Sequence, residues 1–280
     1  LKNKIKKNNI KFDAIIPVHF AGNPFDTKKL RKLVGQNKVI IEDAAHALGA
    51  KYKDGTMVGS CRYANTTVFS LHPVKTIACG EGGVVTTNDK SIYKKLLRLR
   101  SHGINKLDDK FINKKNAFSK GILNPWYYEM QELGYHYRMT EIQASLGISQ
   151  LKKINNFLKR RKQLAKNYFK LLSENKVNFS SMFSKLNPNS SHHLFIININ
   201  NKKVTKSRAE IMHDLKKMGI ITQVHYIPIP MQPFYSKNFS MRDYPHSKKY
   251  YESCLSIPLF YSLTNKEQRY VFNCLNKIIK

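Results

Sequence analysis

The sequence has few cysteines and no long apolar run. Its four cysteines, Cys61, Cys79, Cys254 and Cys274, lie far apart and lack the spacing of metal ligands, so no metal site is expected. Free thiols of this kind are typical of a reducing cytoplasm, which is where we expect the protein to act. No apolar run reaches the roughly 20 residues that cross a bilayer, so no membrane association is expected.

Acidic residues are also scarce. The chain has 18 Asp and Glu against 49 Lys and Arg, which gives a formal charge of +31. Such a charge normally points to nucleic acid as a partner. The excess is mainly lysine spread along the chain, without a basic cluster interleaved with aromatic residues. Runs such as residues 2–7 and 159–162 are therefore interpreted as solvated surface, and no nucleic-acid partner is expected.

Short apolar runs alternate with helical patterns along the chain, which is typical of α/β proteins. A length of 280 residues is enough for one large and one smaller domain. We expect a large domain over residues 1–155, and a long linking helix with a small C-terminal α+β domain over residues 156–280. Core strands of the large domain are expected at residues 14–18, 39–42, 67–70 and 84–87.

Helix starts are marked by capping patterns. Thr140 with Gln143 predicts a long helix to about Leu172, whose regularly spaced apolar residues are interpreted as packing residues. A helix is also expected over residues 90–100, and an irregular loop near a subunit interface over residues 103–131. In the C-terminal unit, the patterns predict strands at 193–199 and 223–227, helices capped by Ser207/Glu210 and Thr264/Glu267, and a loop at 228–233.

The chemistry of the sequence centres on Lys75. It lies in the segment SLHPVK at residues 70–75, between an apolar strand and a glycine turn at residues 80–83. A partly desolvated lysine loses its proton more easily and becomes a nucleophile that can form a Schiff base. An ordinary surface loop is the alternative, because lysine is abundant in this chain.

Asp43 follows a second apolar run, in the segment EDAAHALG at residues 42–49. It falls at the C-terminal end of the expected strand, where open α/β sheets place their ligand sites. The small residues Ala44 and Ala45 would let a flat ring approach the backbone. A helix cap is the alternative role for Asp43. Together with a buried lysine, the carboxylate suggests pyridoxal phosphate, which needs both groups.

These segments closely resemble the DegT-type nucleotide-sugar aminotransferases, which are fold type I pyridoxal phosphate enzymes. The resemblance implies a fold type I transferase with a large mixed-sheet α/β domain. It runs along nearly the whole chain, in the family's order, through residues 16–22, 42–49, 70–75, 80–83, 100–103, 133–140, 223–228 and 255–259.

The resemblance implies roles for the cofactor-binding residues. Lys75 would form the Schiff base and later move a proton between the substrate and cofactor carbons. Asp43 would pair with the ring nitrogen, and Ala45 and His46 would line the ring. Ser70 would donate its hydroxyl to the cofactor phosphate, since five residues separate it from Lys75 and both can line one pocket.

His136 departs from the family pattern. Many relatives have asparagine at this position, and its side chain reaches the cofactor phosphate of the neighbouring subunit. Histidine can also donate to phosphate, so this role and that of a plain interface histidine both stay open. The resemblance further implies a homodimer whose subunits share the active site.

The resemblance is closest to the branch that serves pseudaminic acid biosynthesis. It implies a UDP-linked 4-keto-6-deoxy-N-acetyl hexosamine as substrate, glutamate as amino donor and transamination as the reaction. Gln223, His225 and Tyr226 match a segment near the substrate, although a packed strand is the alternative for Tyr226. Another keto sugar nucleotide, or a non-catalytic relative that binds the cofactor without turnover, remains open.

The resemblance also bears on the start of the chain. Relatives carry a further region before the segment that matches residues 13–20. That region supplies a turn at a helix N-terminus, which suits phosphate binding, and part of the sugar-nucleotide site. We therefore expect this chain to be a fragment of a longer protein, and whether the fragment binds the cofactor by itself stays open.

Overall fold

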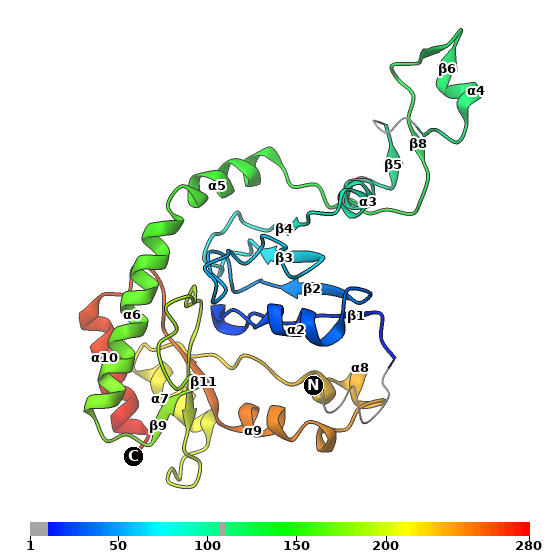
Figure 1. The fold of residues 1–280 in the computed structure, drawn as a ribbon. Coiled ribbons are helices and arrows are strands. Elements are labelled where there is room, and N and C mark those ends of the chain that lie inside the picture. Colours follow the sequence, from blue (N-terminus) through cyan, green and yellow to red (C-terminus); the bar gives the residue numbers. More distant parts are fainter. Residues whose placement is uncertain (1–10, 107–109) are drawn as a thin grey trace.

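The large domain is built on a mixed four-stranded sheet. The computed structural model describes residues 11–106 and 110–280 (Figure 1). Strands β1 (Ala14–Ile15), β2 (Val39–Asp43) and β3 (Thr66–Ser70) are parallel, and β4 (Gly83–Thr86) pairs antiparallel with β3. The expected strands are thus present, with shifted ends. The first is shorter than predicted, because Val18 contributes only an isolated bridge to Asp43.

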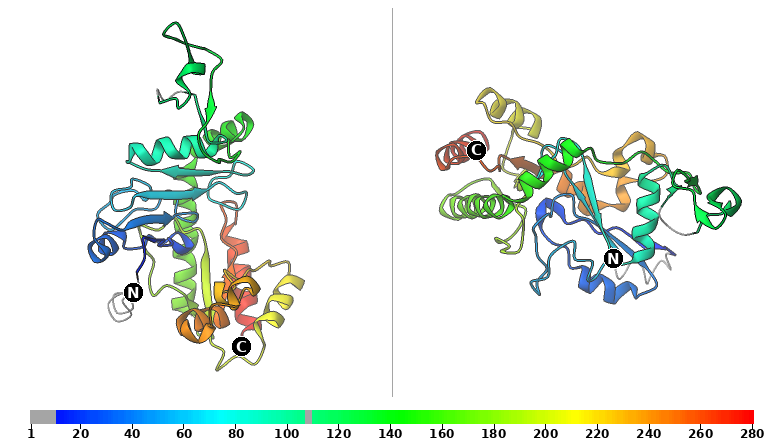
Figure 2. Two further views of the ribbon diagram at one scale, coloured as in Figure 1. Left: turned by 90° about the vertical axis from the view of Figure 1, so that its right-hand side faces the viewer. Right: turned by 90° about the horizontal axis from the view of Figure 1, so that it is seen from above.

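Helices lie on both sides of this sheet. Helix α2 (Thr27–Val34) begins after Asp26, which accepts a hydrogen bond from the Lys29 amide, and its Leu30 packs on Ile40 of β2. Helix α3 (Lys90–Arg100), predicted at these residues, lies beyond β4 on the side away from β1 (Figure 2). A short 3-10 turn, η1 (Phe20–Gly22), follows β1 and faces the small domain.

The predicted long helix is divided in two, which corrects the expectation. Thr140 and Gln143 form the predicted capping box of α5 (Glu141–Leu151), and α6 (Ile154–Glu174) begins after a break at residues 152–153. The interpretation of its apolar residues as packing residues is wrong for α5, where the Ile142 side chain is 82% exposed. It holds for Leu164 of α6, which is fully buried in the small domain.

The small domain is an antiparallel sheet with helices packed on both of its faces. Strands β9 (Phe179–Ser181), β10 (Phe195–Ile199) and β11 (Cys254–Ile257) lie in the order β11-β10-β9. The core is formed by apolar residues from these strands and from α6, α7 (Arg208–Lys217) and α10 (Asn265–Ile278). The predicted capping boxes at Ser207/Glu210 and Thr264/Glu267 start α7 and α10. The division near residue 155 stays a prediction.

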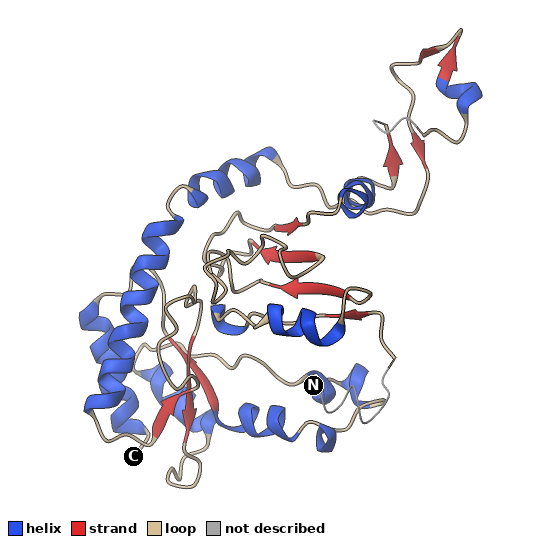
Figure 3. Cartoon of the chain, viewed as in Figure 1, coloured by secondary structure: helices blue, strands red, loops and turns tan. Residues whose placement is uncertain are grey.

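The segment between α7 and β11 differs from the expectation. Of the strand predicted at residues 223–227, only Gln223 pairs, through an isolated bridge to Ser256. The loop predicted at residues 228–233 contains the 3-10 turn η2 (Ile229–Met231) and the start of α8 (Pro233–Ser236), because proline fits the first turn of a helix. The turn η3 (Met241–Asp243) and helix α9 (Pro245–Ser253) follow (Figure 3).

Residues 101–106 and 110–137 belong to an arm that projects from the large domain, away from the small one (Figures 1 and 2). It was expected to be irregular, but it contains short paired strands, β5 (Ile104–Asn105) with β8 (Glu129–Met130) and β6 (Phe118–Ser119) with β7 (Ile122–Leu123), and helix α4 (Lys114–Ala117). Gly103, at φ +71°, packs so closely on Gly134 that neither position has room for a Cβ atom.

The arm exposes many large apolar side chains. Ile112, Ile122, Trp126 and Leu133 are each between 72% and 80% exposed. Several large exposed apolar side chains on one projecting segment are typical of an interaction surface. Within the described residues, no helix is both long and apolar enough to cross a membrane.

Candidate active site

The candidate site lies at the carboxyl edge of the parallel strands. Asp43 is the last residue of β2, and its carbonyl accepts a hydrogen bond from the His19 amide at 2.9 Å. Its carboxylate Oδ1 accepts another from the Ala45 amide at 3.0 Å. These contacts fix the strand end on both sides, so that the carboxylate is held at the edge where ligand sites are expected.

Lys75 lies in the turn that follows β3. Its amide donates to the carbonyl of His72 at 2.9 Å, and its side chain is half-buried. Burial lowers the pKa of the Lys75 amine, while the charge of Asp43 acts in the opposite direction and raises it. Burial is the larger effect, so the amine loses its proton more easily than that of an exposed lysine.

Asp43 and Lys75 line one cavity of about 900 Å³, called here the Asp43 hollow. The predicted residues Ala45, His46 and Tyr226 line it as well. The cavity therefore brings together five of the nine predicted residues, from β2, the turn after β3 and the segment after α7. Its other walls are Val18, Phe20, Ile227, Pro228, Ile229, Pro230, Phe239, Tyr244, His246, Ser247 and Tyr250.

His46 forms the centre of an aromatic stack in this hollow. Its ring lies 4.5 Å from that of His193, and the two planes are inclined by 29°. On another side its Nε2 lies 3.4 Å from the hydroxyl of Tyr226. Burial, with the charges of Lys75 and His225, lowers the pKa of His46 to about 3, so the ring is neutral. Its buried Nδ1 has no hydrogen-bond partner among the described residues.

His225 and Gln223 lie behind the hollow and do not line it. His225 Nδ1 lies 2.7 Å from the hydroxyl of Ser256, and its carbonyl accepts a hydrogen bond from Tyr250 at 2.7 Å. Burial and the charge of Lys75 lower the pKa of His225. Gln223 exchanges backbone hydrogen bonds with Ser256. These two residues therefore support Tyr226 from the small sheet and are not among the walls.

Ser70 and His136 are also outside the walls of the hollow. Ser70 ends β3, and its hydroxyl accepts a hydrogen bond from the His72 amide at 3.3 Å. His136 lies at the base of the arm, where it is exposed and its Nε2 is 3.1 Å from the Arg138 guanidinium. The structure thus does not place Ser70 in one pocket with Lys75, because the hydroxyl is turned toward its own loop.

A buried carboxylate supports the site from the other face of β2. Glu42 accepts hydrogen bonds from the hydroxyls of Thr27, Tyr52 and Thr67 at 2.5 to 2.7 Å, and His19 Nε2 lies 3.2 Å away. Burial acts to raise the pKa of Glu42, but the hydrogen bonds from His19, Thr27 and Tyr52 outweigh it and lower the pKa. The network fixes the strand that ends in Asp43.

Several residues of the site were missed by the sequence reasoning. The strand pattern predicts no role in the site for His193, whose ring stacks on that of His46. Phe20 lies in the segment of residues 16–22, and its ring is 6.1 Å from that of His46. Tyr250 of α9 carried no signal in the sequence, because its neighbours in the hollow come from distant segments.

The sheet with an aspartate at one strand end, the half-buried lysine in the next turn and the smaller α+β unit are the features that the resemblance implied for a fold type I transferase. The family model of the DegT/DnrJ/EryC1/StrS aminotransferase family matches residues 1–276. The chain belongs to this aminotransferase family, as its motifs predicted.

Individual relatives agree with this assignment. The chain is 34% identical to the UDP-4-amino-4,6-dideoxy-N-acetyl-beta-L-altrosamine transaminase of Campylobacter jejuni over 281 residues, which are 100% of this chain and 69% of the relative. Among solved structures, it matches Helicobacter pylori PseC, an aminotransferase of pseudaminic acid biosynthesis, with a TM-score of 0.84 and 29% identity over 98% of this chain and 69% of that one. The PLP-form of the sugar aminotransferase Spr1654 from Streptococcus pneumoniae matches with a TM-score of 0.80 and 29% identity over 95% of this chain and 68% of that one.

Proposed function

We propose that this chain carries the catalytic lysine of a pyridoxal phosphate-dependent aminotransferase for a UDP-linked 4-keto-6-deoxy-N-acetyl hexosamine, with glutamate as amino donor. The reaction would serve the biosynthesis of pseudaminic acid or a related surface sugar. The observation that carries the proposal is that Asp43 and Lys75 line the same hollow. The four free cysteines, all buried, are consistent with a reaction in the cytoplasm.

The donor set of the Asp43 hollow fits pyridoxal phosphate. Asp43 offers a carboxylate for a protonated ring nitrogen, and Lys75 offers an amine of lowered pKa. The orphaned Nδ1 of His46 would gain a partner from a polar substituent of the cofactor ring. Ala45 leaves room for a flat ring beside the strand end. When bound, the cofactor supplies an electron sink for the substrate carbon that loses its proton.

The residues of the chain have distinct tasks in this proposal. Lys75 would hold the cofactor through its Nζ, and its amine, once displaced by an amino donor, would move a proton between the substrate carbon and the cofactor carbon. The negative charge of Asp43 would favour the protonated ring nitrogen. The neutral His46 fixes the ring without adding a positive charge that would compete with it.

The substrate is assigned to the Tyr226 side of the hollow. The Tyr226 side chain is 54% exposed, so its hydroxyl can meet sugar hydroxyls while it also lies near His46. His225 and Gln223 would act through it, since they hold the segment to Ser256. The Campylobacter and Helicobacter relatives support the choice of a UDP-linked amino sugar product.

The phosphate of the cofactor is assigned to Ser70 and, across a homodimer, to His136. The exposed apolar arm that carries His136 supports dimerisation, because a buried interface would cover it. Ser70 would have to turn its hydroxyl from the His72 amide toward the phosphate, a rotation about one bond.

Trapping of the cofactor tests the proposal. The purified protein is incubated with pyridoxal phosphate, reduced with borohydride and mapped by peptide mass. We expect an adduct on Lys75, and amine transfer from glutamate to the UDP-linked 4-keto sugar. An adduct without transfer to any keto sugar nucleotide would favour a non-catalytic relative, and transfer to a 3-keto sugar would correct the substrate. An adduct spread over surface lysines, with Lys75 unmodified, would overturn the role of Lys75.

A further inference from the structure

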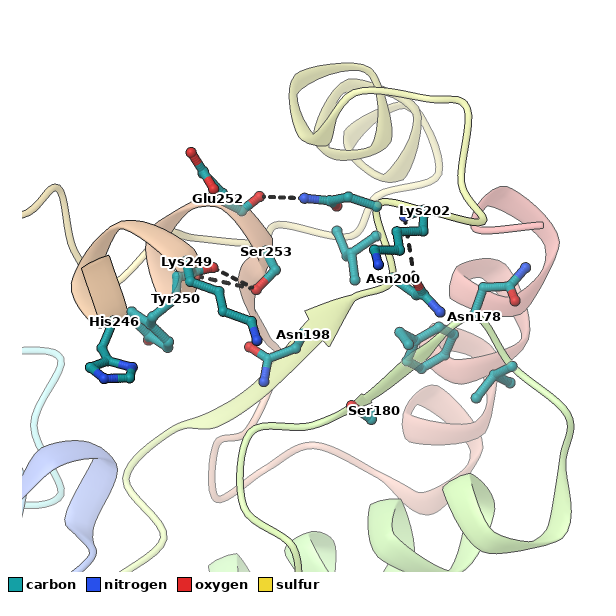
Figure 4. A pocket seen from close by; sticks show the side chains of 14 residues that line it. Asn178, Ser180, Asn198, Asn200, Lys202, His246, Lys249, Tyr250, Glu252 and Ser253 are labelled. Carbon is teal, nitrogen blue, oxygen red and sulfur yellow. Dashed lines mark hydrogen bonds between the residues drawn. The ribbon is translucent and has the colours of Figure 1, made fainter. Parts of the chain in front are cut away.

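A second cavity, lined by polar residues, lies on the face of the small sheet that carries α9. It has a volume of about 720 Å³ and is called here the α9 hollow (Figure 4). Alternate residues of β10 explain its position. Ile197 and Ile199 belong to the core under α6, α7 and α10, while Ile196 packs with Tyr250 of α9 on the opposite face. Asn198 follows on that opposite face, where it lines the hollow.

The walls of the α9 hollow are rich in amide groups. Asn178, Asn198 and Asn200 line it from separate points of the sheet, and Figure 4 shows their side chains around one space. The buried Oδ1 of Asn198 has no hydrogen-bond partner within the described part of the chain. A buried carbonyl oxygen without a partner costs free energy, so a donor from a bound molecule would stabilise it.

Positive charge prevails in the α9 hollow. Lys202 and Lys249 line it together with His246, against the single carboxylate of Glu252. That carboxylate lies 3.9 Å from the ammonium of Lys248, which does not line the hollow and balances its charge from outside. The two lysines of the hollow therefore retain a net attraction for an anion.

We infer that the α9 hollow binds a phosphorylated sugar in its nucleotide-linked form, at a site separate from the catalytic one. Lysine ammonium groups suit phosphate oxygens, and the amides can both donate to and accept from sugar hydroxyls or a pyrimidine base. The volume falls in the range of ligand pockets for molecules of this size. The choice of a sugar nucleotide over other phosphorylated sugars rests on the proposed function.

Helix α9 connects this site to the catalytic one. His246 and Tyr250 line both hollows, so the helix is the partition between them. The Tyr250 hydroxyl donates to the carbonyl of His225, next to Tyr226. A molecule that displaces Tyr250 from the α9 side would thus shift the Tyr226 wall of the Asp43 hollow. The ligand would thereby alter the substrate KM more than kcat.

Calorimetry of the pyridoxal phosphate-loaded protein tests the inference. The probe is UDP-N-acetylglucosamine, which has no keto group to accept an amine, with UMP, glucose 1-phosphate and inorganic phosphate in separate titrations. We expect two sites per chain for the probe. The double variant Lys202→Ala/Lys249→Ala should weaken one of them by roughly tenfold or more, and Asn198→Ala should weaken the same one.

The matched control is Lys159→Ala, which removes an exposed lysine of α6 outside both hollows and should leave both sites unchanged. No site in the wild type that the double variant weakens, whether one site or two are observed, would overturn the inference. Inorganic phosphate binding as tightly as the probe would overturn the sugar nucleotide as the ligand. The inference is judged by the effect of Lys202→Ala/Lys249→Ala on binding, and the same titration of the cofactor-free protein separates it from amine transfer and from trapping on Lys75.

Discussion

The imidazole ring of His46 rests on that of His193, with ring centres 4.5 Å apart and planes inclined by 29°. Both side chains are less than 10% exposed, and His46 is the one that lines the Asp43 hollow. His193 therefore supports His46 from behind the hollow. The carbonyl of His193 accepts a hydrogen bond from the buried Arg161 guanidinium at 3.1 Å, which connects His193 to α6.

The stack predicts an acid-sensitive fold. Burial lowers the pKa of His46 to about 3 and that of His193 to about 2. Below the ordinary value of 6.5 the unfolded chain binds protons that the folded chain does not, so stability is present above that pH and is lost as the pH falls. We expect urea unfolding of the cofactor-free protein to lose up to about 1.4 kcal/mol per pH unit per histidine. His193→Phe should flatten this slope, and an unchanged slope would contradict the assignment.

The lysine in the hollow predicts an essential nucleophile. Lys75→Ala should abolish borohydride-stable trapping and lower amine transfer by roughly a thousandfold or more, since among the described residues that line the hollow Lys75 is the one that carries an amine. Circular dichroism should show an unchanged fold, because the half-buried side chain makes no packing contact that the core requires. Lys53→Ala, which removes a side chain that is 92% exposed, is the matched control. An unchanged transfer rate in Lys75→Ala would rule out covalent catalysis.

The charge of Asp43 predicts a shift in pH dependence. Trapping requires the neutral amine of Lys75, so its rate should rise with pH. The rate should level off at a lower pH than for an exposed lysine, because burial lowers the pKa of Lys75. Asp43 opposes that effect, so Asp43→Asn should move the midpoint to a still lower pH. The same variant should lower amine transfer by orders of magnitude, since the ring nitrogen loses its charged partner. A midpoint that moves upward in Asp43→Asn would contradict the arrangement.

The network around Glu42 predicts a stability role without direct chemistry. Glu42→Gln replaces an acceptor of three hydroxyl groups with an amide that can satisfy fewer of them, which should cost about 2–4 kcal/mol in urea unfolding. Glu174→Gln, at an exposed helix position, should cost less than about 0.5 kcal/mol. Equal losses in the two variants would show that the network is not held in solution.

The arm predicts the oligomeric state. Replacing Ile112, Trp126 and Leu133 together with serine should convert a dimer to a monomer in light scattering, because the apolar contact area is lost. The fold should persist, since these side chains are exposed in the single chain. A wild-type protein that stays monomeric at high concentration would contradict a dimer formed through the arm.

Local chemistry in the sequence was sufficient for much of the fold and for the centre of the site. The capping boxes at Thr140, Ser207 and Thr264 start helices as predicted, because each is a contact within one turn. Asp43 ends β2, and Lys75 follows β3. These neighbouring strands are parallel, so their carboxyl ends lie at the same edge of the sheet and bring the two residues together.

Contacts between distant segments could not be predicted in this way. His193 reaches His46 only because the small sheet packs against the end of β2, a relationship that no local pattern encodes. The break at residues 152–153 carries neither glycine nor proline, and the apolar spacing continues through it. The strand predicted at residues 223–227 does not form. In the part of the chain that the structure describes, Gln223 bridges to Ser256 and the apolar residues after it have no strand beside them.

Glu42 and Asp43 are consecutive residues of one strand, so their side chains point to opposite faces of the sheet. A slip of β2 by one residue would exchange the two faces and turn a longer carboxylate toward Lys75. The hydroxyl groups that donate to Glu42 can reach its carboxylate in only one of these two registers of β2. Three residues that do not line the Asp43 hollow, Thr27, Tyr52 and Thr67, thus decide which carboxylate faces Lys75, so the acid of the site is selected by contacts made on the other face of the sheet.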